Sequence, residues 1–375
     1  MTSGRQLQSL ITSTGELRLS FAEVEIGEPG PDEVIVSVQA APLNPSDLGL
    51  MLGPADISTA SASGEGADRV ITASVPERAL SRLATRLDKS QPVGNEGAGI
   101  VVGAGSSDAA QALVGKTVAM IGGAMFGEYR LLNYRMCQEL PAGTTAADGA
   151  SWFVNPMTAL AMVETMRRDG HTAIVFTAAA SNLGQMLNRV CLEDGIGIVN
   201  IVRSEDQRRI LEEIGAEYIV DSTTETFRAD LTAAITATGA TVAFDAIGGG
   251  TLASDILNSM EAALSADATE FSVYGTNVHK QVYIYGALNP GKTELARGFG
   301  FAWGVNGWLL APTLAKLGTD QYRLRERVVN SLTTTFASNY TRQISLLDVL
   351  DPAVMASYSQ QKTGEKYLVV PNLGE

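Results

Sequence analysis

The feature that most constrains the fold is a regular alternation of short apolar runs and helical patterns between residues 173 and 285. Five apolar runs have the length and composition of buried strands, and they lie at 173–176, 198–202, 217–220, 242–244 and 282–285. The helical patterns between them lie at about 183–192, 204–214, 227–237 and 252–264. Repeated strand–helix units of this kind predict a doubly wound parallel sheet in an α/β domain, with a nucleotide at its carboxyl edge.

The rest of the chain is expected to form a second domain, because 375 residues are more than one hydrophobic core usually supports. The first part is interpreted as β structure, with strands at 34–38, 97–102 and 116–121. A last apolar run at 366–370 is interpreted as a strand that rejoins this domain. Residues 54–90 look like an insertion, either a lid or a surface loop, with a short helix opening at Pro76-Glu77.

Composition narrows the possible functions. The net charge of −14 repels nucleic acid and anionic membrane surfaces, so neither is expected as a partner. Two cysteines cannot form a disulfide framework or a four-thiolate zinc site, and two histidines leave little for metal chemistry. With no apolar run long enough to span a bilayer and no secretory segment near Met1, a cytoplasmic enzyme is expected.

The turn after the first strand of the α/β region, Thr177-Ala-Ala-Ala-Ser-Asn-Leu-Gly184, is where a dinucleotide-binding fold holds the pyrophosphate. Its small residues let the backbone approach a diphosphate, and the following helix supplies N–H groups and a positive partial charge. The alternative is an ordinary helix cap, since the full G-x-G-x-x-G pattern is absent. The strand–helix units that follow favour the nucleotide, with contacts from Ala180, Ser181, Asn182, Leu183 and Gly184.

The other strand ends of this region are expected at the same edge. Arg203 follows the second strand, where NAD-type enzymes usually carry an acidic residue, and Arg208 is close behind. A guanidinium suits a 2′-phosphate, so NADPH is favoured over NADH, which stays possible. The alternative for these arginines is a solvated helix face that they share with Glu205 and Asp206. The later strand ends add Ile247, Gly248, Tyr285 and Gly286 as cofactor-binding candidates.

Several short segments, taken in order, resemble the medium-chain dehydrogenase/reductase superfamily, in its zinc-free quinone oxidoreductase and 2-enoyl thioester reductase branch. The resemblance covers nearly the whole chain. It rests on Asn44-Pro-Ser-Asp47, Gly94-Asn-Glu-Gly-Ala-Gly99, Asn155-Pro-Met-Thr-Ala159, Ala180-Ser-Asn-Leu-Gly-Gln185 and Thr363-Gly-Glu-Lys366. The family implies a GroES-like β-barrel catalytic domain, residues 1–150 completed by 296–375, and a Rossmann cofactor domain, residues 151–295.

The resemblance also implies site residues. Asn44 and Asn95 stand where zinc-dependent members carry Cys and His ligands, so no metal is expected. Thr158 matches the family residue near the nicotinamide, with Asn155 one turn before it. Asn44, Asp47 and Asn155 are the catalytic candidates, although a plain turn or helix cap is the alternative for 44–47. The proton-donating tyrosine of the thioester reductases has no counterpart at 52–56.

Together these features predict a zinc-independent, NADPH-dependent oxidoreductase that transfers hydride to a quinone or to an activated alkene or carbonyl. The alternative within this class is 2-enoyl thioester reduction, against which the missing tyrosine counts. The alternative of another class is a non-catalytic NADP-binding redox sensor or structural dimer. The expected partners are a small-molecule hydride acceptor and a second copy of the chain, since the family implies a homodimer formed through the cofactor-domain sheet near 282–288.

Overall fold

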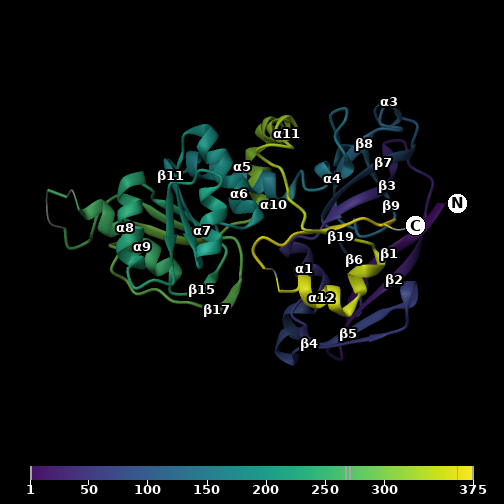
Figure 1. Ribbon diagram of the computed structural model, residues 1–375, viewed down its shortest axis with the longest axis horizontal. Coiled ribbons are helices and arrows are strands. Elements are labelled where there is room, and N and C mark those ends of the chain that lie inside the picture. Colours follow the sequence, from purple (N-terminus) through teal and green to yellow (C-terminus); the bar gives the residue numbers. More distant parts are fainter. Residues whose placement is uncertain (1, 267, 270–271, 361, 374–375) are drawn as a thin grey trace. The chain divides into compact units, whose positions relative to one another are not determined.

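The computed structural model describes residues 2–266, 268–269, 272–360 and 362–373, and the chain divides into two compact units (Figure 1). Unit 1 consists of Met1–Val154 and Ser331–Glu375, and unit 2 consists of Asn155–Asn330. The predicted α/β class is confirmed. Unit 2 begins four residues after the expected boundary at 150/151, and it runs on to Asn330 where the sequence suggested an end at 295.

Unit 2 is built on a six-stranded parallel sheet, which confirms the predicted doubly wound architecture. Its strand order is β13-β12-β11-β14-β16-β18, and every neighbouring pair is parallel. The strands are β11 (Ala173–Phe176), β12 (Gly197–Val202), β13 (Tyr218–Asp221), β14 (Val242–Asp245), β16 (Lys280–Ile284) and β18 (Trp303–Gly307). The strand order reverses beside β11, so the switch point of the sheet lies between β11 and β14.

Four helices connect the strands as the sequence predicts, and they are α6 (Asn182–Asp194), α7 (Glu205–Glu212), α8 (Phe227–Thr238) and α9 (Leu252–Ser265). The region also contains α5 (Val154–Arg168), α10 (Leu310–Leu317) and α11 (Asp320–Asn330), which are not among the predicted helices. Helices α8 and α9 lie side by side (Figure 1), and Leu231, Ile256 and Met260 pack with Val175 and Val282 in one buried core. A separate parallel pair consists of β15 (Gly248–Gly250) and β17 (Asn289–Thr293).

The region after residue 295 differs from the expectation, because it contributes β18, α10 and α11 to unit 2. The sequence of β18, Trp303-Gly-Val-Asn-Gly307, has neither an alternating pattern nor an apolar run. It nevertheless pairs with β16 along its whole length. The strand forms because its backbone pairs with β16, although its own sequence lacks a strand pattern.

Unit 1 consists mainly of two β-sheets. The first has the order β4-β5-β2-β1-β6, and the second has the order β10-β8-β7-β3-β20-β19, with β9 also paired to β3. The strands are β1 (Thr2–Ile11), β2 (Glu16–Ile26), β3 (Glu33–Pro42), β4 (Asp56–Ser63), β5 (Val70–Ser74), β6 (Gln91–Pro92), β7 (Glu96–Ala104), β8 (Thr117–Ile121), β9 (Tyr129–Asn133), β10 (Cys137–Glu139), β19 (Arg342–Ile344) and β20 (Tyr367–Val369). Because β20 pairs with β3, the C-terminal run rejoins the first domain, as predicted.

The short helices of unit 1 are α1 (Pro45–Met51), α2 (Glu77–Leu80), α3 (Asp108–Gln111), α4 (Ala146–Gly149) and α12 (Pro352–Tyr358). Much of the suspected insertion is part of the first sheet, since β5 pairs with β2 and β4 pairs with β5. Leu80, Leu83 and Leu87 of this segment pack against the hydrophobic core of unit 1. Across the described residues, we find no helix that combines the length and apolar character needed to cross a membrane.

Candidate cofactor and catalytic sites

The turn between β11 and α6 is tight. Ala178 has a positive φ of 52°, and the Ser181 amide donates to the Ala178 carbonyl at 3.0 Å. The Ser181 hydroxyl caps α6 by accepting from the Gly184 amide at 3.1 Å. A Cβ at Gly184 would lie 2.0 Å from the carbonyl oxygen of Ala179, so the helix rests directly on the turn. The first N–H groups of α6 therefore start at the carboxyl edge of the sheet, beside the switch point.

The predicted pyrophosphate contacts all lie in this turn and the first turn of α6. Ala180 and Gly184 are buried, whereas Ser181, Asn182 and Leu183 are partly exposed. The cap that the alternative interpretation requires is present. An ordinary cap does not require the close backbone approach at Gly184, and this approach is the feature typical of a dinucleotide turn.

A buried hydrogen-bond network joins the ends of β11 and β14. Thr177 Oγ1 donates to Asp245 Oδ1 at 2.8 Å and accepts from the Ala246 amide at 2.8 Å. The Asp245 carboxylate also accepts from the amides of Ile247 at 2.9 Å and Gly248 at 3.1 Å. Since Thr177 and Asp245 are fully buried, the network holds the two loops at the switch point in one arrangement.

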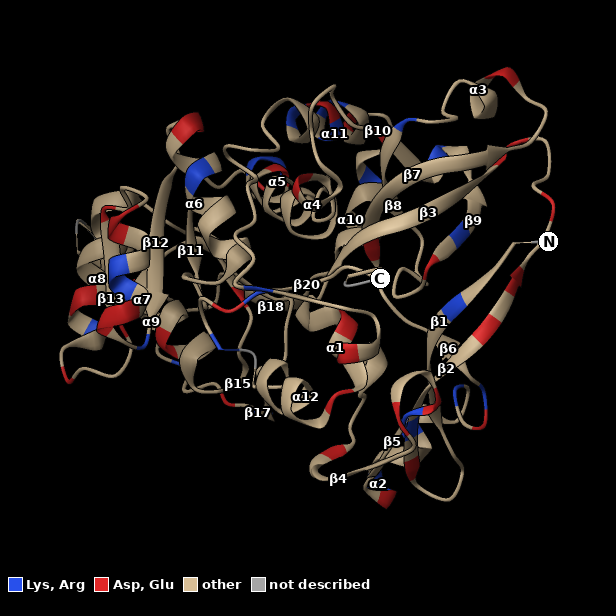
Figure 2. Cartoon of the chain, turned by 45° about the vertical axis from the view of Figure 1, so that its right-hand side comes forward, with Lys and Arg blue, Asp and Glu red and all other residues tan. Residues whose placement is uncertain are grey.

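The two predicted arginines differ in their surroundings. Arg203 directly follows β12 with an exposed side chain, and within the described part of the chain its guanidinium forms no ion pair. Arg208 Nη2 donates to the Ile219 carbonyl at 3.0 Å, and its Nε lies 3.7 Å from Glu205. Figure 2 shows that α7 carries charges of both signs, as the solvated-face interpretation expects. Of these two arginines, Arg203 is the one whose guanidinium is available to bind an anion. Arg208 mainly links α7 to β13.

Tyr285 and Gly286 follow β16 at the same carboxyl edge. The ring of Tyr285 stacks on Phe176, with centroids 5.8 Å apart and planes within 12°. Burial, followed by the negative charge of Asp245, raises the pKa of Tyr285, which keeps the phenol neutral. A Cβ at Gly286 would lie 2.6 Å from the Ala246 carbonyl oxygen, so the loops after β14 and β16 are in contact.

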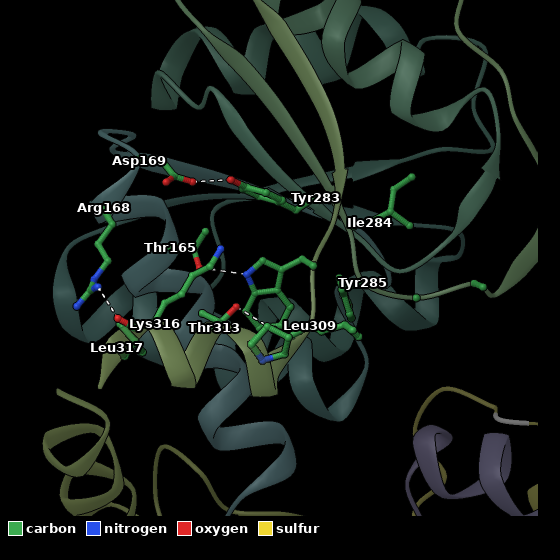
Figure 3. Close-up of a pocket in the computed structure, with 15 residues that line it drawn as sticks. Thr165, Arg168, Asp169, Tyr283, Ile284, Tyr285, Leu309, Thr313, Lys316 and Leu317 are labelled. Carbon is green, nitrogen blue, oxygen red and sulfur yellow. Dashed lines mark hydrogen bonds between the residues drawn. The ribbon is translucent and has the colours of Figure 1, made fainter. Parts of the chain in front are cut away.

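A cavity of about 770 Å³ lies beside the last two strand ends of unit 2 (Figure 3). Its walls come from the C-terminal half of α5, the ends of β16 and β18, and α10. Trp308 Nε1 donates to Thr165 Oγ1 at 3.1 Å, and the Tyr283 hydroxyl donates to Asp169 at 2.6 Å. The volume is that of a small-molecule site, and Tyr285 belongs to its lining.

In unit 1, the Asn44–Asp47 segment opens α1 and is buried. The amides of Asn44 and Asn95 donate to the two oxygens of Asp47 at 2.8 Å and 2.7 Å. Burial raises the pKa of Asp47 to about 7, and the charge of Glu96 contributes to the rise while the amide hydrogen bonds oppose it. Asp47 therefore stabilises the turn before α1, as the interpretation of 44–47 as a turn or helix cap expects. Its pKa also lies near neutral pH.

Glu96 lies against this segment and is fully buried. Its Oε1 accepts from Asn44 Nδ2 at 2.9 Å, and its Oε2 accepts from the amides of Phe153 and Val154, each at 2.9 Å. Val154 is the first residue of α5, so the carboxylate stabilises the start of that helix. Asn44 Oδ1, also buried, has no hydrogen-bond partner among the described residues.

Lys366 brings a positive charge into the same cluster. Its ammonium group donates to Ser151 Oγ at 2.8 Å and to Ser338 Oγ at 3.1 Å. The Tyr340 hydroxyl donates to the same Ser151 Oγ at 2.8 Å, and Lys366 Nζ lies 5.3 Å from the centre of the Tyr340 ring. Burial lowers the pKa of Lys366 to about 8, opposed by the charges of Glu96 and Asp47.

The structure thus brings two of the three predicted catalytic residues, Asn44 and Asp47, into one buried cluster. Asn155 lies in the first turn of α5, partly exposed, and Thr158 is buried further along that helix. In residues 2–266, 268–269, 272–360 and 362–373, no group of three or more His, Cys, Asp or Glu side chains could hold a metal ion. The zinc-free mechanism stays a prediction.

Sequence reasoning assigned no role to four members of the cluster. Glu96 and Lys366 stand inside two of the matched segments, and this was a signal that they lie near the site. Ser151 and Tyr340 carry no such signal, because they lie 189 positions apart and meet only in the folded unit.

No model of a known protein family matches the sequence. Solved structures match it over almost its full length. A candidate NADPH:quinone reductase from Mesorhizobium loti has 24% sequence identity and a TM-score of 0.73, with 99% of this chain and 100% of that chain covered. A candidate NADPH:quinone reductase from Bacillus thuringiensis has 19% identity and a TM-score of 0.74, with 99% of each chain covered. The Etr1p complex with NADP and crotonyl-CoA has 16% identity and a TM-score of 0.66, with 99% and 100% covered.

The chain therefore has the fold of these solved reductase structures, which also include the CurK enoyl reductase. The resemblance that the sequence motifs suggest is confirmed for the fold, and both units are included in the match.

Proposed function

We propose that the protein is an NADPH-dependent reductase that transfers hydride, without zinc, to a quinone or to an activated alkene or carbonyl. The observation that carries this proposal is the carboxyl edge of the parallel sheet. Three features lie at this edge. They are the turn before α6, which requires glycine at position 184, the hydrogen-bonded ends of β11 and β14, and the exposed Arg203. The fold match to candidate NADPH:quinone reductases, and to a complex that holds NADP, supports the same cofactor.

Each predicted residue has a role in this proposal. The first turn of α6 binds the pyrophosphate, Arg203 binds the 2′-phosphate, and the loops that contain Gly248 and Tyr285 bind the rest of the dinucleotide. A bound reduced nicotinamide supplies the hydride. The cavity beside Tyr285 holds the acceptor, because its aromatic walls suit a flat organic molecule. Asn44 and Asp47 with Asn155 and Thr158 orient the reactants.

The cofactor assignment is tested by titrating the protein with NADPH and with NADH and following fluorescence. Arg203→Ala should weaken NADPH binding about tenfold, because a charge-assisted hydrogen bond to phosphate is lost, and NADH binding should not change. Arg209→Ala is the matched control, since this exposed arginine of α7 already pairs with Asp206 at 2.8 Å. Equal affinities for both cofactors, unaffected by Arg203→Ala, would remove the NADPH assignment.

An acceptor screen separates the chemical alternatives. The fold match to the Etr1p complex, which holds crotonyl-CoA, favours enoyl thioester reduction as the second candidate. NADPH oxidation is therefore measured with a benzoquinone, with a cyclic enone and with crotonyl-CoA. Preference for crotonyl-CoA would select the second candidate. Tight NADPH binding without oxidation by any acceptor would favour a redox sensor. A homodimer stays a prediction, to be checked by light scattering.

A further inference from the structure

The cavity proposed for the hydride acceptor has a lysine in its wall. Lys316, in the last turn of α10, lines the cavity together with the rings of Tyr283 and Trp308. We propose that Lys316 selects acceptors that carry a negatively charged group, such as a carboxylate or a sulfonate, on a flat conjugated ring. This inference rests on the proposed function and names the class of acceptor that the same cavity binds.

The whole cavity belongs to unit 2, because every lining residue lies between Thr165 and Leu317. Two of its walls are joined by the pairing of β16 with β18 along the whole length of β18. Arg168 Nη1 donates to the Lys316 carbonyl at 3.4 Å, and this contact joins the end of α5 to α10. The place of Lys316 relative to the aromatic wall is therefore set within one unit.

Several neutral polar side chains of the wall already use their hydrogens inside the protein. Trp308 Nε1 donates to Thr165 Oγ1 at 3.1 Å, and the Tyr283 hydroxyl donates to Asp169 at 2.6 Å. The hydroxyls of Thr165 and Thr313 each donate to a main-chain carbonyl at 2.8 Å. Since none of these groups has a hydrogen left to donate, they contribute little to the recognition of an acceptor's oxygen atoms.

The ammonium group of Lys316 is different, because it forms no ion pair and no hydrogen bond with any residue that the structure describes. Of the other charged residues in the lining, Arg168 pairs with Asp320 at 2.7 Å, and Asp169 accepts the Tyr283 hydroxyl. Figure 3 shows the Lys316 side chain extending from α10 toward the middle of the lining residues, whereas Asp169 lies at their edge beside Tyr283. Lys316 is therefore the lining cation that is available to an anion.

An available ammonium group beside aromatic rings favours an anionic acceptor for two reasons. The net charge of −14 repels anions at long range, so the binding of an anion requires a local cation. The hydrogen bonds that an ammonium group donates to a carboxylate or sulfonate are charge-assisted, and they are stronger than bonds between neutral groups. The apolar body of the acceptor packs on the rings of the wall.

The position of Lys316 along α10 sets the length of the acceptor. The helix begins soon after β18 ends, at the carboxyl edge of the sheet where Tyr285 and Gly286 follow β16. Lys316 follows Leu310 by six positions, which corresponds to about 9 Å along the helix axis. Because helical side chains lean toward the start of their helix, the ammonium group lies within reach of a two-ring acceptor at that edge.

The test compares Lys316→Met with the wild type in the full-length protein, with NADPH as the hydride donor and naphthoquinone sulfonate or neutral naphthoquinone as the acceptor. The substitution removes the charge and keeps a long apolar side chain. It should raise KM for the sulfonate about tenfold, equivalent to about 1.4 kcal/mol, and leave KM for the neutral quinone unchanged. Each KM is compared between proteins for the same quinone, so the different reduction potentials of the two quinones cancel.

Two control variants and the NADPH affinity support the comparison. Lys316→Arg keeps the charge and should keep the wild-type preference for the sulfonate. Lys89→Met makes the same change in net charge at an exposed lysine of unit 1, whose Nζ donates to the Thr85 carbonyl at 2.9 Å, and both KM values should stay unchanged. Fluorescence titration should give Lys316→Met the wild-type NADPH affinity. A tenfold loss would instead assign Lys316 to the cofactor phosphates and overturn the inference.

Binding without turnover separates this inference from the proposed function. In equilibrium dialysis with oxidised NADP present, naphthoquinone sulfonate should bind Lys316→Met about tenfold more weakly than the wild type. Equal changes in KM for the two quinones, or unchanged binding, would refute the role of Lys316, while continued NADPH oxidation would leave the proposed function intact. If the wild type oxidises NADPH with neither quinone, the proposed function fails, and the dialysis alone decides whether Lys316 binds the anion.

Discussion

Gly184→Ala perturbs the contact on which the proposed cofactor site depends. The added Cβ would lie 2.0 Å from the carbonyl oxygen of Ala179 and 2.6 Å from its carbonyl carbon. Since Cβ atoms essentially never come within 3.0 Å of a neighbour and both partners are backbone atoms, the turn or the helix must move by about 1 Å. The Ser181 cap bond to the residue 184 amide would lengthen with this shift.

The size of the effect follows from these contacts. Overpacking of a buried position costs about 1–3 kcal/mol, and a weakened N-cap adds up to about 1 kcal/mol. The better helix propensity of alanine offsets at most about 1 kcal/mol. We expect the free energy of unfolding to fall by about 1–3 kcal/mol. NADPH affinity should fall at least about tenfold, equivalent to 1.4 kcal/mol, because the helix N–H groups move away from the pyrophosphate.

Urea denaturation measures the stability, and fluorescence titration measures the NADPH affinity. Gly49→Ala is the matched control, because a Cβ at this helical position of α1 meets nothing within 4 Å. That variant should be neutral or stabilised by up to about 1 kcal/mol. If Gly184→Ala unfolds at the wild-type urea concentration and binds NADPH with wild-type affinity, the turn is not as tight as argued and the cofactor site loses its basis.

Three further substitutions test the buried polar groups. Thr177→Val removes the hydroxyl that donates to Asp245, and should lower the free energy of unfolding by about 2 kcal/mol; an unchanged Tm would contradict this. Lys280→Met removes the ammonium group that lies 2.6 Å from the Glu261 carboxylate and leaves that carboxylate buried without its partner. Urea denaturation should show that the free energy of unfolding falls by about 3–5 kcal/mol. A fall below about 1 kcal/mol would indicate a solvated pair. The pKa of Asp47 is raised to about 7, so its contribution to stability is fully present below about pH 4 and is lost as the pH rises through 7. The stability advantage of wild type over Asp47→Asn should therefore shrink by about 2–4 kcal/mol from pH 4 to pH 7, and a constant difference would refute the shift.

The strand–helix units of unit 2 could be predicted because their signals are local. The run 173–176 is apolar and bounded by polar residues, and it forms β11 with the same limits. Ser181 and Ser204 occupy the N-caps of α6 and α7, where a serine oxygen satisfies a helix N–H group. These interactions join residues within about one turn, so the sequence pattern alone determines them.

The end of unit 2 could not be predicted, because β18 is held by distant partners. It pairs with β16, and Trp303 packs edge-to-face on Phe299 at 5.0 Å between ring centroids. Neither interaction leaves a periodic pattern in the residues of β18 themselves. The predicted boundary at 295 therefore missed a strand and two helices that complete the unit.

The buried cluster around Asn44 and Asp47 in unit 1 also combines residues that the sequence could and could not indicate. Asn44 and Asp47 stand in a recognisable motif, so the sequence could nominate them. The raised pKa of Asp47 on α1 arises from burial and from the charge of Glu96, which lies on β7. Asn44 Oδ1, which has no hydrogen-bond partner among the described residues, is buried in the same cluster. No motif indicates that Tyr340 joins this cluster.

The amino-acid sequence by itself determined the α/β alternation, the small-residue turn before α6 and the arginine that directly follows β12, because each depends on neighbours in the chain. Only the tertiary structure decided which charged and hydroxyl groups share the buried cluster of unit 1. Lys366 reaches Ser151 across 215 positions and Tyr340 reaches it across 189. Such contacts, and the pKa shifts that follow from them, depend on the path of the whole chain through unit 1, which no local pattern specifies.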